Sequence, residues 1–234
     1  MKTLRPFFSY FGSKWRQSCR LPTPEYDVII EPFAGSAGYS LRHHRHQVKL
    51  YDLDPVICAI WDYLIHAPEE EILNLPDLGP DQTVDDLQVS DAARYLIGFW
   101  LNKGNSVPCT RWGKWARNPE YRSRPCNFWG PGIRQRIAAQ QPFIRHWSVD
   151  QSSYADIPQV VGTWHVDPPY VEKGLYYRCS ARSIDFEHLG TWCRELRGQV
   201  MVCEQAGADW LPFREFAKMK STREEFQVRQ VEQT

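Results

Sequence analysis

Residues 27–52 contain the pattern that most constrains the fold of this 234-residue chain. A β-branched run, DVII at 27–30, precedes the small-residue turn EPFAGSAG and a segment near 39–46 that is predicted to be helical. A second run, VKLY at 48–51, ends in Asp52. A strand, a glycine-rich turn, a helix and a second strand ending in an acid open many nucleotide-binding α/β folds. The pattern therefore predicts a parallel sheet with a ligand site at the carboxyl ends of its strands.

Strands and helices continue to alternate along the chain, with one interruption. Apolar spacing and capping residues predict helices at 55–65, 90–101 and 185–196, and a loop or short helices in the Pro- and Asp-rich stretch 68–89. Further strands are predicted at 147–149, 163–166 and 199–203, with a closing strand at 225–231. We expect one α/β domain with an inserted lobe: core at 1–89, lobe at 90–144, and core again at 145–234.

The interruption is basic and rich in Gly, Pro and Asn. Residues 103–136 hold eight Lys and Arg residues against Glu120 alone, although the whole chain has a formal net charge of zero. Such a stretch is either a charged soluble loop or a surface for nucleic-acid phosphates. The predicted DNA contacts are Lys103, Arg111, Lys114, Arg117, Arg122 and Arg124.

Residues in three short stretches suggest a ligand site in the first part of the chain. Gly35 and Gly38 would let a ligand approach the backbone at a helix N-terminus, although a tight turn without a ligand is the simpler alternative. Asp52 stands where such folds hold ribose hydroxyls, and Asp54 suits a helix N-cap. Lys14 lies between aromatic residues in FFSYFGSKW and is either functional or an ordinary surface lysine.

The string VDPPY at 166–170 ends a predicted strand with a rigid polar corner. Two prolines fix two φ angles, so the carbonyls and the Asp167 carboxylate become stationary acceptors. Such acceptors suit an amino group that must be gripped, and Tyr170 adds a flat ring beside them. The alternative is a proline-rich corner with a solvated acid.

The cysteine pattern and the hydropathy of the chain indicate in which cellular compartment we expect the protein. The seven cysteines are scattered and show no C-x-x-C spacing, which argues against a disulfide framework and against a zinc site. The N-terminus lacks an apolar secretory segment, and no apolar run approaches the roughly 18 residues of a membrane span. We expect a cytoplasmic protein with reduced thiols, no metal, no membrane association and no evident obligate protein partner.

EPFAGSAG, LYD and VDPPY in this order, with YFGSK near the N-terminus, resemble the Dam-type (D12 class) DNA adenine N6-methyltransferases from Phe8 to about Phe213. DPPY alone also occurs in other amino-methyltransferases, so the ordered set carries the resemblance. It implies a Rossmann-like S-adenosylmethionine-dependent methyltransferase sheet that acts on double-stranded DNA without a metal. It also implies that the basic lobe is a target-recognition region, and it favours a stand-alone, phage-borne enzyme.

The resemblance assigns roles to individual residues. Cofactor binding is implied for Tyr10, Lys14, Glu31, Pro32, Phe33, Gly35, Gly38, Asp52 and Asp167, and catalysis for Asp167, Pro168, Pro169 and Tyr170. The family's turn is usually F-x-G-x-G, whereas this chain has Ala37 in place of the second glycine and Gly38 after it. The compact recognition region leaves open whether four bases or fewer are read.

The implied mechanism extrudes adenine from the duplex, stacks it on Tyr170 and holds its N6 hydrogens at Asp167 and the Pro168 carbonyl. DPPY does not by itself identify the ring. N4-cytosine methylation and RNA adenine methylation therefore remain alternatives, as does an inactive DNA-binding relative. A hydride-transferring dinucleotide enzyme is disfavoured because G-x-G-x-x-G is missing.

Overall fold

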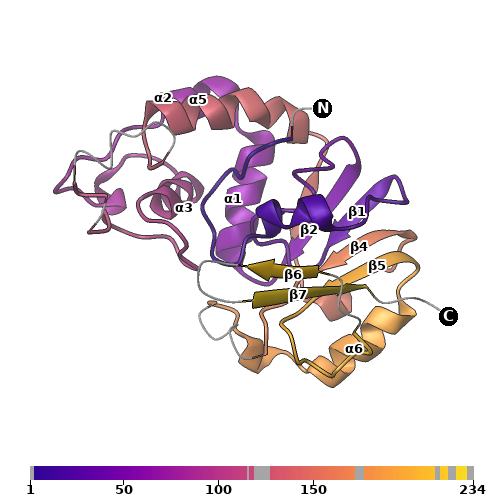
Figure 1. Ribbon diagram of the computed structural model, residues 1–234. Helices are drawn as coiled ribbons and strands as arrows, with labels where there is room; N and C mark the ends of the chain where they lie inside the picture. Colours follow the sequence, from indigo (N-terminus) through magenta and orange to yellow (C-terminus); the bar gives the residue numbers. More distant parts are fainter. Residues whose placement is uncertain are drawn as a thin grey trace.

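The computed structural model describes residues 3–114, 116–118, 127–171, 177–213, 217–220 and 225–230, the last two segments as backbone only. Its sheet has seven strands in the order β3-β2-β1-β4-β5-β7-β6 (Figure 1). The strands are β1 (Val28–Glu31), β2 (Gln47–Asp52), β3 (Ser148–Gln151), β4 (Gly162–Val166), β5 (Gly198–Cys203), β6 (Ala217–Lys220) and β7 (Glu225–Gln230). The first five pair in parallel, and β7 is antiparallel to β5 and β6. The predicted α/β class and the closing strand are confirmed.

The helices predicted at 55–65, 90–101 and 185–196 are present, whereas the helix at 131–140 was not predicted. The α-helices are α1 (Pro55–His66), α2 (Glu69–Asn74), α3 (Asp91–Trp100), α5 (Pro131–Gln140) and α6 (Phe186–Glu195). The short 3-10 helices are η1 (Lys14–Arg16), η2 (Ser18–Arg20), η3 (Val84–Asp86), η4 (Gln141–Ile144), η5 (Tyr154–Asp156) and η7 (Ala181–Ser183). The acid Asp54 caps α1 by accepting from Val56 N–H, and Ser90 and Asp185 cap α3 and α6 in the same way.

The sheet has a hydrophobic core on each face, because successive strand residues point to opposite sides. Ile29 packs in the cluster that contains α1, α3 and α5, whereas Ile30 packs with Trp164 and with the apolar face of α6. Figure 1 shows α6 on the other side of the sheet from α1. The chain is thus built in three layers, with the sheet in the middle.

The described part of the lobe shares the first of these cores. The cluster that contains Ile29 of the sheet also buries three residues of the lobe: Trp100 of α3, Ile133 of α5, and Trp129, which precedes α5. The Trp100 indole donates to the Phe7 carbonyl at 2.9 Å, and the Arg136 guanidinium lies 4.9 Å from the Trp100 ring. The N-terminal segment is therefore held against the lobe as well as against the sheet.

The helix predicted near 39–46 is wrong, because this segment folds as consecutive turns. The backbone N–H groups of Arg42, His43 and His46 donate to the carbonyls three residues earlier, as in turns, rather than four residues earlier as in an α-helix. The Ser40 N–H then donates to the Glu31 carboxylate at 2.8 Å instead of to a backbone carbonyl. The Tyr39 hydroxyl donates to the Pro22 carbonyl at 2.8 Å, which fixes the segment against the N-terminal part of the chain.

The strand order reverses between β1 and β4, and this position defines the site. The chain runs from β1 to β2 and on to β3 at one edge, then returns to β4 on the other side of β1. In open α/β sheets ligands bind beyond the carboxyl ends of the strands at this reversal. Within the described residues, no helix has the length and apolar character needed to cross a bilayer.

Candidate functional site

A cavity of about 630 Å³ opens at the carboxyl ends of β1, β2 and β4. The structure brings to its wall every residue to which the sequence assigned a cofactor or catalytic role: Tyr10, Lys14, Glu31, Pro32, Phe33, Gly35, Gly38, Asp52, Asp167, Pro168, Pro169 and Tyr170. They come from four separate stretches of the chain. One cavity thus unites the N-terminal segment, the two strand-ending acids and the VDPPY corner.

Asp52 is held at the end of β2 by two backbone donors. Gly35 N–H and Asp54 N–H each donate to one oxygen of its carboxylate at 2.9 Å. Burial raises the pKa of Asp52 to about 6, although these backbone hydrogen bonds oppose the shift. The Gly35 N–H is thereby occupied by the protein itself, and no helix follows the turn. The predicted role of this turn as a helix N-terminal site is therefore wrong.

Lys14 and Asp167, which both line the cavity, form an ion pair although they are 153 residues apart. The ammonium donates to Asp167 Oδ2 at 2.9 Å and lies 2.8 Å from Oδ1. It also donates to the Gly12 carbonyl at 3.2 Å and lies 4.6 Å from the centre of the Tyr170 ring. Asp167 Oδ1 is buried, and the Lys14 ammonium contacts both oxygens of this carboxylate.

Tyr170 is only 7% exposed, with the Lys14 ammonium over its ring. A base could therefore stack on this ring only after neighbouring groups move. Tyr177 lies near the same region: its hydroxyl donates to the Phe11 carbonyl at 3.2 Å, and its ring centre is 5.8 Å from that of Tyr10. Tyr177 lines the cavity together with Tyr10 and Tyr170, which gives this wall three tyrosine rings.

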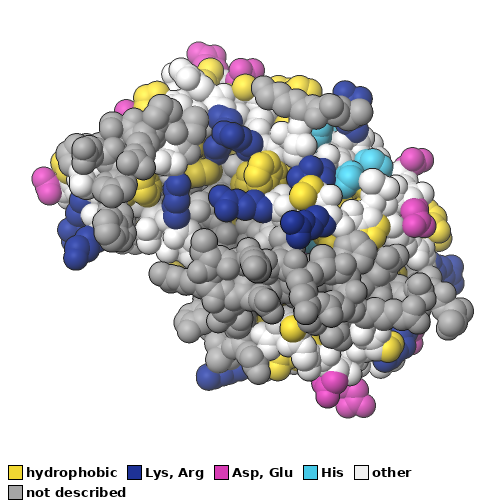
Figure 2. Space-filling view, viewed as in Figure 1, with side chains coloured by type: hydrophobic (Ala, Val, Ile, Leu, Met, Phe, Trp, Pro, Cys, Tyr) yellow, Lys and Arg dark blue, Asp and Glu magenta, His cyan; other side chains and the backbone are white. Residues whose placement is uncertain are grey.

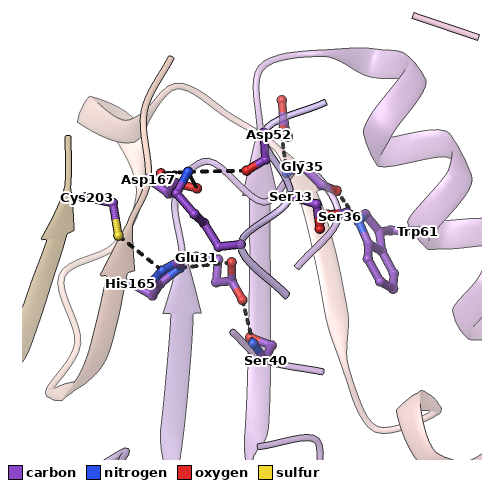
Figure 3. A network of polar contacts seen from close by, with 12 residues as sticks. Ser13, Glu31, Gly35, Ser36, Ser40, Asp52, Trp61, His165, Asp167 and Cys203 are labelled. Carbon is purple, nitrogen blue, oxygen red and sulfur yellow. Dashed lines mark hydrogen bonds and ion pairs between the residues drawn. The ribbon is translucent and has the colours of Figure 1, made fainter. Parts of the chain in front are cut away.

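Glu31, His165 and Cys203 form a buried polar row across β1, β4 and β5 (Figure 3). His165 Nδ1 lies 3.2 Å from Glu31 Oε2, and His165 Nε2 lies 3.6 Å from Cys203 Sγ. Burial alone would lower the pKa of His165, but Cys203 and Glu31 raise it to about 10. The imidazole is therefore protonated at neutral pH, and it balances the buried Glu31 carboxylate.

Glycine at position 38 lets the turn pack against the N-terminal segment. A Cβ atom there would lie 2.5 Å from the Trp15 backbone nitrogen and 2.9 Å from the Lys14 carbonyl carbon. Any larger side chain would push away the backbone that carries Lys14. The Ser36 hydroxyl donates to the Ser13 hydroxyl at 2.7 Å and joins the same two segments.

Among the described residues, carboxylates outnumber basic groups in the wall of the cavity. Its acids are Glu31, Asp52, Asp54 and Asp167, and its basic side chains are Lys14 and His165. The cavity therefore favours a ligand with net positive charge over a phosphate-bearing one. Phe33 and Tyr154, whose ring centres are 5.7 Å apart, add an aromatic wall on the side of β3.

The predicted DNA contacts are described only in part. Lys103, Arg111, Lys114 and Arg117 are exposed, whereas Arg122 and Arg124 lie outside the described residues. Two other basic residues of the stretch are used within the protein. Arg134 pairs with Asp77, and Arg136 donates to the Pro6 carbonyl at 3.2 Å.

Sequence reasoning missed several residues of the site. Tyr154 follows β3 at the carboxyl edge, where the rule that located Asp52 and Asp167 would also have found it. His165 stands two residues before Asp167 in a buried strand, where a polar side chain is itself a signal. Cys203 offered no such signal, since buried cysteines are common in protein cores.

Among the described residues, no group of three His, Cys, Asp or Glu side chains is arranged to hold a metal ion. A search against protein-family models gave no match for this chain. A search of curated proteins gave none either.

Proposed function

We propose that this protein transfers a methyl group from S-adenosylmethionine to the N6 amino group of adenine in double-stranded DNA. The observation that carries the proposal is the convergence of the VDPPY corner with the N-terminal lysine and both strand-ending acids in one cavity. The five parallel strands of the chain follow the order 3-2-1-4-5 of a nucleotide-binding fold. Next to β5, however, lies the antiparallel strand β7 in place of a sixth parallel strand. These features support a Rossmann-like methyltransferase sheet.

The charge of the cavity fits this cofactor. S-adenosylmethionine carries a sulfonium and an ammonium group against one carboxylate, so it suits a wall in which acids are in excess. A dinucleotide would instead bring a pyrophosphate, which needs free backbone N–H groups at a helix N-terminus. Here the Gly35 N–H is bound by Asp52, and the turn does not continue into a helix. The turn therefore lacks the free helix N-terminus at which a hydride-transferring enzyme would bind the pyrophosphate of its dinucleotide.

The bound cofactor supplies an electrophilic methyl group, and the chain supplies the positioning. The Asp167 carboxylate, paired with Lys14, would accept one hydrogen of the target amino group once the neighbouring groups move to admit the base. The Pro168 carbonyl, fixed by the two prolines, accepts the other hydrogen. Holding both hydrogens would turn the nitrogen lone pair toward the methyl group, so that orientation and fixed charge carry the rate. As the N–C bond forms and the S–C bond breaks, the nitrogen would release one of its two hydrogens as a proton, for which the Asp167 carboxylate is the adjacent acceptor.

The raised pKa of Asp52 leads to a prediction of how cofactor binding depends on pH. Ribose hydroxyls donate to the charged carboxylate, so binding favours the ionised form and lowers its pKa from about 6. Affinity should be constant above pH 7 and should fall as the pH drops below 6, by up to about tenfold per unit. Calorimetric titration of S-adenosylmethionine between pH 5 and 8 measures this.

The variant Asp52→Asn is the control for that titration. It cannot ionise, so its weaker binding should not change between pH 5 and 7. An identical fall in both proteins would show that another group is responsible. Failure of the wild-type protein to bind S-adenosylmethionine at any pH would contradict the proposed function itself.

A further inference from the structure

A tight turn at residues 10–13 holds the Lys14 ammonium at the cavity. The Ser13 N–H donates to the Tyr10 carbonyl at 3.4 Å, and Gly12 has a left-handed φ of 73°. Glycine adopts this φ without the steric strain that a side chain would bring. The Gly12 carbonyl accepts from the Lys14 ammonium at 3.2 Å, and Lys14 in turn pairs with Asp167. The position of this turn therefore sets where Lys14 meets the Asp167 carboxylate.

Tyr177, which lies beyond the VDPPY corner in the chain, grips this turn. Its hydroxyl donates to the Phe11 carbonyl at 3.2 Å. Its ring centre lies 5.8 Å from that of Tyr10 and 5.7 Å from that of Phe11. A Cβ atom on Gly12 would overlap the Tyr177 hydroxyl oxygen, whereas it would lie 3.5 Å from Cζ of the same ring. Glycine at position 12 is thus what lets the hydroxyl reach the backbone of the turn.

The N-terminal turn and the stretch that begins at the VDPPY corner are therefore joined twice. Asp167 pairs with Lys14, and Tyr177 bonds to Phe11. Tyr177 and Lys14 both line the cavity. Burial and the negative charges of Asp167 and Asp52 raise the pKa of Tyr177, so its hydroxyl remains a donor at neutral pH. Loss of one contact would leave the other to hold the two segments together alone.

We propose that Tyr177 is a positioning residue for methyl transfer, which fixes Lys14 through the backbone of the turn and fixes the Asp167 carboxylate through Lys14. This inference rests on the proposed function and adds a residue that the VDPPY corner and the glycine-rich turn do not contain. Tyr177 need not touch the target base in this role. A misplacement of about 1 Å can lower a rate by about 100-fold, even when the change is remote from the reacting atoms.

The first test is the variant Tyr177→Phe, which removes the hydroxyl and keeps the ring. We expect the single-turnover rate of methyl transfer, at saturating cofactor and duplex DNA, to fall by roughly 10- to 100-fold. Duplex affinity should stay at the wild-type value, because the variant keeps every charge, including the Lys and Arg side chains along the middle of the face in Figure 2. A loss of rate without a loss of affinity distinguishes positioning from a general loss of structure.

The matched control is Tyr39→Phe. It removes a hydroxyl that likewise donates to a backbone carbonyl, that of Pro22, but Tyr39 does not line the cavity. This control should keep the wild-type rate.

The variant Gly12→Ala tests the contact from the other side. In the wild-type protein the added methyl group meets the Tyr177 hydroxyl, so the turn must shift and the rate should fall. In the Tyr177→Phe protein the new Cβ atom would be 3.5 Å from Cζ, an ordinary van der Waals contact. The strain of alanine at a left-handed φ is the same in both proteins. Gly12→Ala should therefore lower the rate less in Tyr177→Phe than in the wild type.

The possible outcomes separate this inference from the proposed function. A wild-type rate in Tyr177→Phe, an equal fall in Tyr39→Phe, or additive effects of Gly12→Ala and Tyr177→Phe would overturn the positioning role and leave the proposed function standing. A fall in duplex affinity as large as the fall in rate would also overturn it, since the hydroxyl would then act in DNA binding. A wild-type protein that methylates no base contradicts the proposed function, and the positioning role is then overturned with it.

Discussion

Replacement of Asp167 by asparagine is expected to lower the rate of methyl transfer by on the order of 10²–10³-fold while cofactor and duplex binding persist. Asparagine keeps the shape of the side chain but replaces one acceptor oxygen with an NH₂ donor. It also loses the negative charge that strengthens a hydrogen bond to the target amino group. Single-turnover transfer of a labelled methyl group to duplex DNA measures the rate directly.

Structural damage must be separated from the loss of that acceptor. Asp167→Asn leaves the Lys14 ammonium without its counter-charge, so urea unfolding and titration of S-adenosylmethionine should accompany the kinetics. The same substitution at exposed Asp209, which does not line the cavity, provides the matched control and should leave the rate unchanged. Wild-type transfer by the Asp167→Asn protein would show that this carboxylate does not grip the amino group.

Replacement of His165 by leucine should destabilise the fold by about 3–5 kcal/mol, because it leaves a buried carboxylate without its partner. Glu31 is 1% exposed, and after the change the Ser40 N–H is the one donor that remains to it among the described residues. That N–H holds the turn that forms one wall of the cavity, so affinity for S-adenosylmethionine should fall as well. Urea unfolding gives the free energy, and calorimetry gives the affinity.

A double-mutant cycle identifies the cause of this destabilisation. Glu31→Gln removes the charge but keeps an acceptor for Ser40, so Glu31→Gln/His165→Leu should be more stable than His165→Leu alone. The pKa of His165 is raised to about 10 in the folded protein, so its contribution is complete below pH 6.5 and is lost as the pH rises through 10. The variant His165→Leu should lack this decline. Equal stability of the His165→Leu and wild-type proteins at pH 7 would disprove the pairing.

The five parallel strands and the site were predictable because their rules are local, whereas strand β6 was not predicted. A β-branched run that ends in an acid marks the carboxyl end of a strand, and parallel strands bring these ends to one edge. Glu31, Asp52 and Asp167 each end or follow such a strand, which is why all three line the cavity. The helices at 55–66 and 91–100 were likewise marked by Asp54 and Ser90 as caps.

The remaining features depend on contacts between distant parts of the chain. The segment at 39–46 follows the small-residue turn as a helix would, but its Ser40 N–H and Tyr39 hydroxyl bond to Glu31 and Pro22, which lie in other parts of the chain. The pairing of Lys14 with Asp167 requires the N-terminal segment to cross the end of β4. The contacts of His165 with Glu31 and Cys203 depend on the register between β1, β4 and β5. That register cannot be read from the sequence of any one strand.

The most direct test of the account is mass spectrometry of nucleosides from treated nucleic acid. Duplex DNA of mixed sequence and RNA are incubated separately with the wild-type protein and S-adenosylmethionine, then digested completely. The account predicts N6-methyladenine in the DNA, none in the RNA, and almost none in either with Asp167→Asn. N4-methylcytosine in place of N6-methyladenine would contradict the assignment of the base. No methylated nucleoside from a wild-type protein that binds the cofactor would contradict the central claim, that this cavity methylates an amino group of DNA.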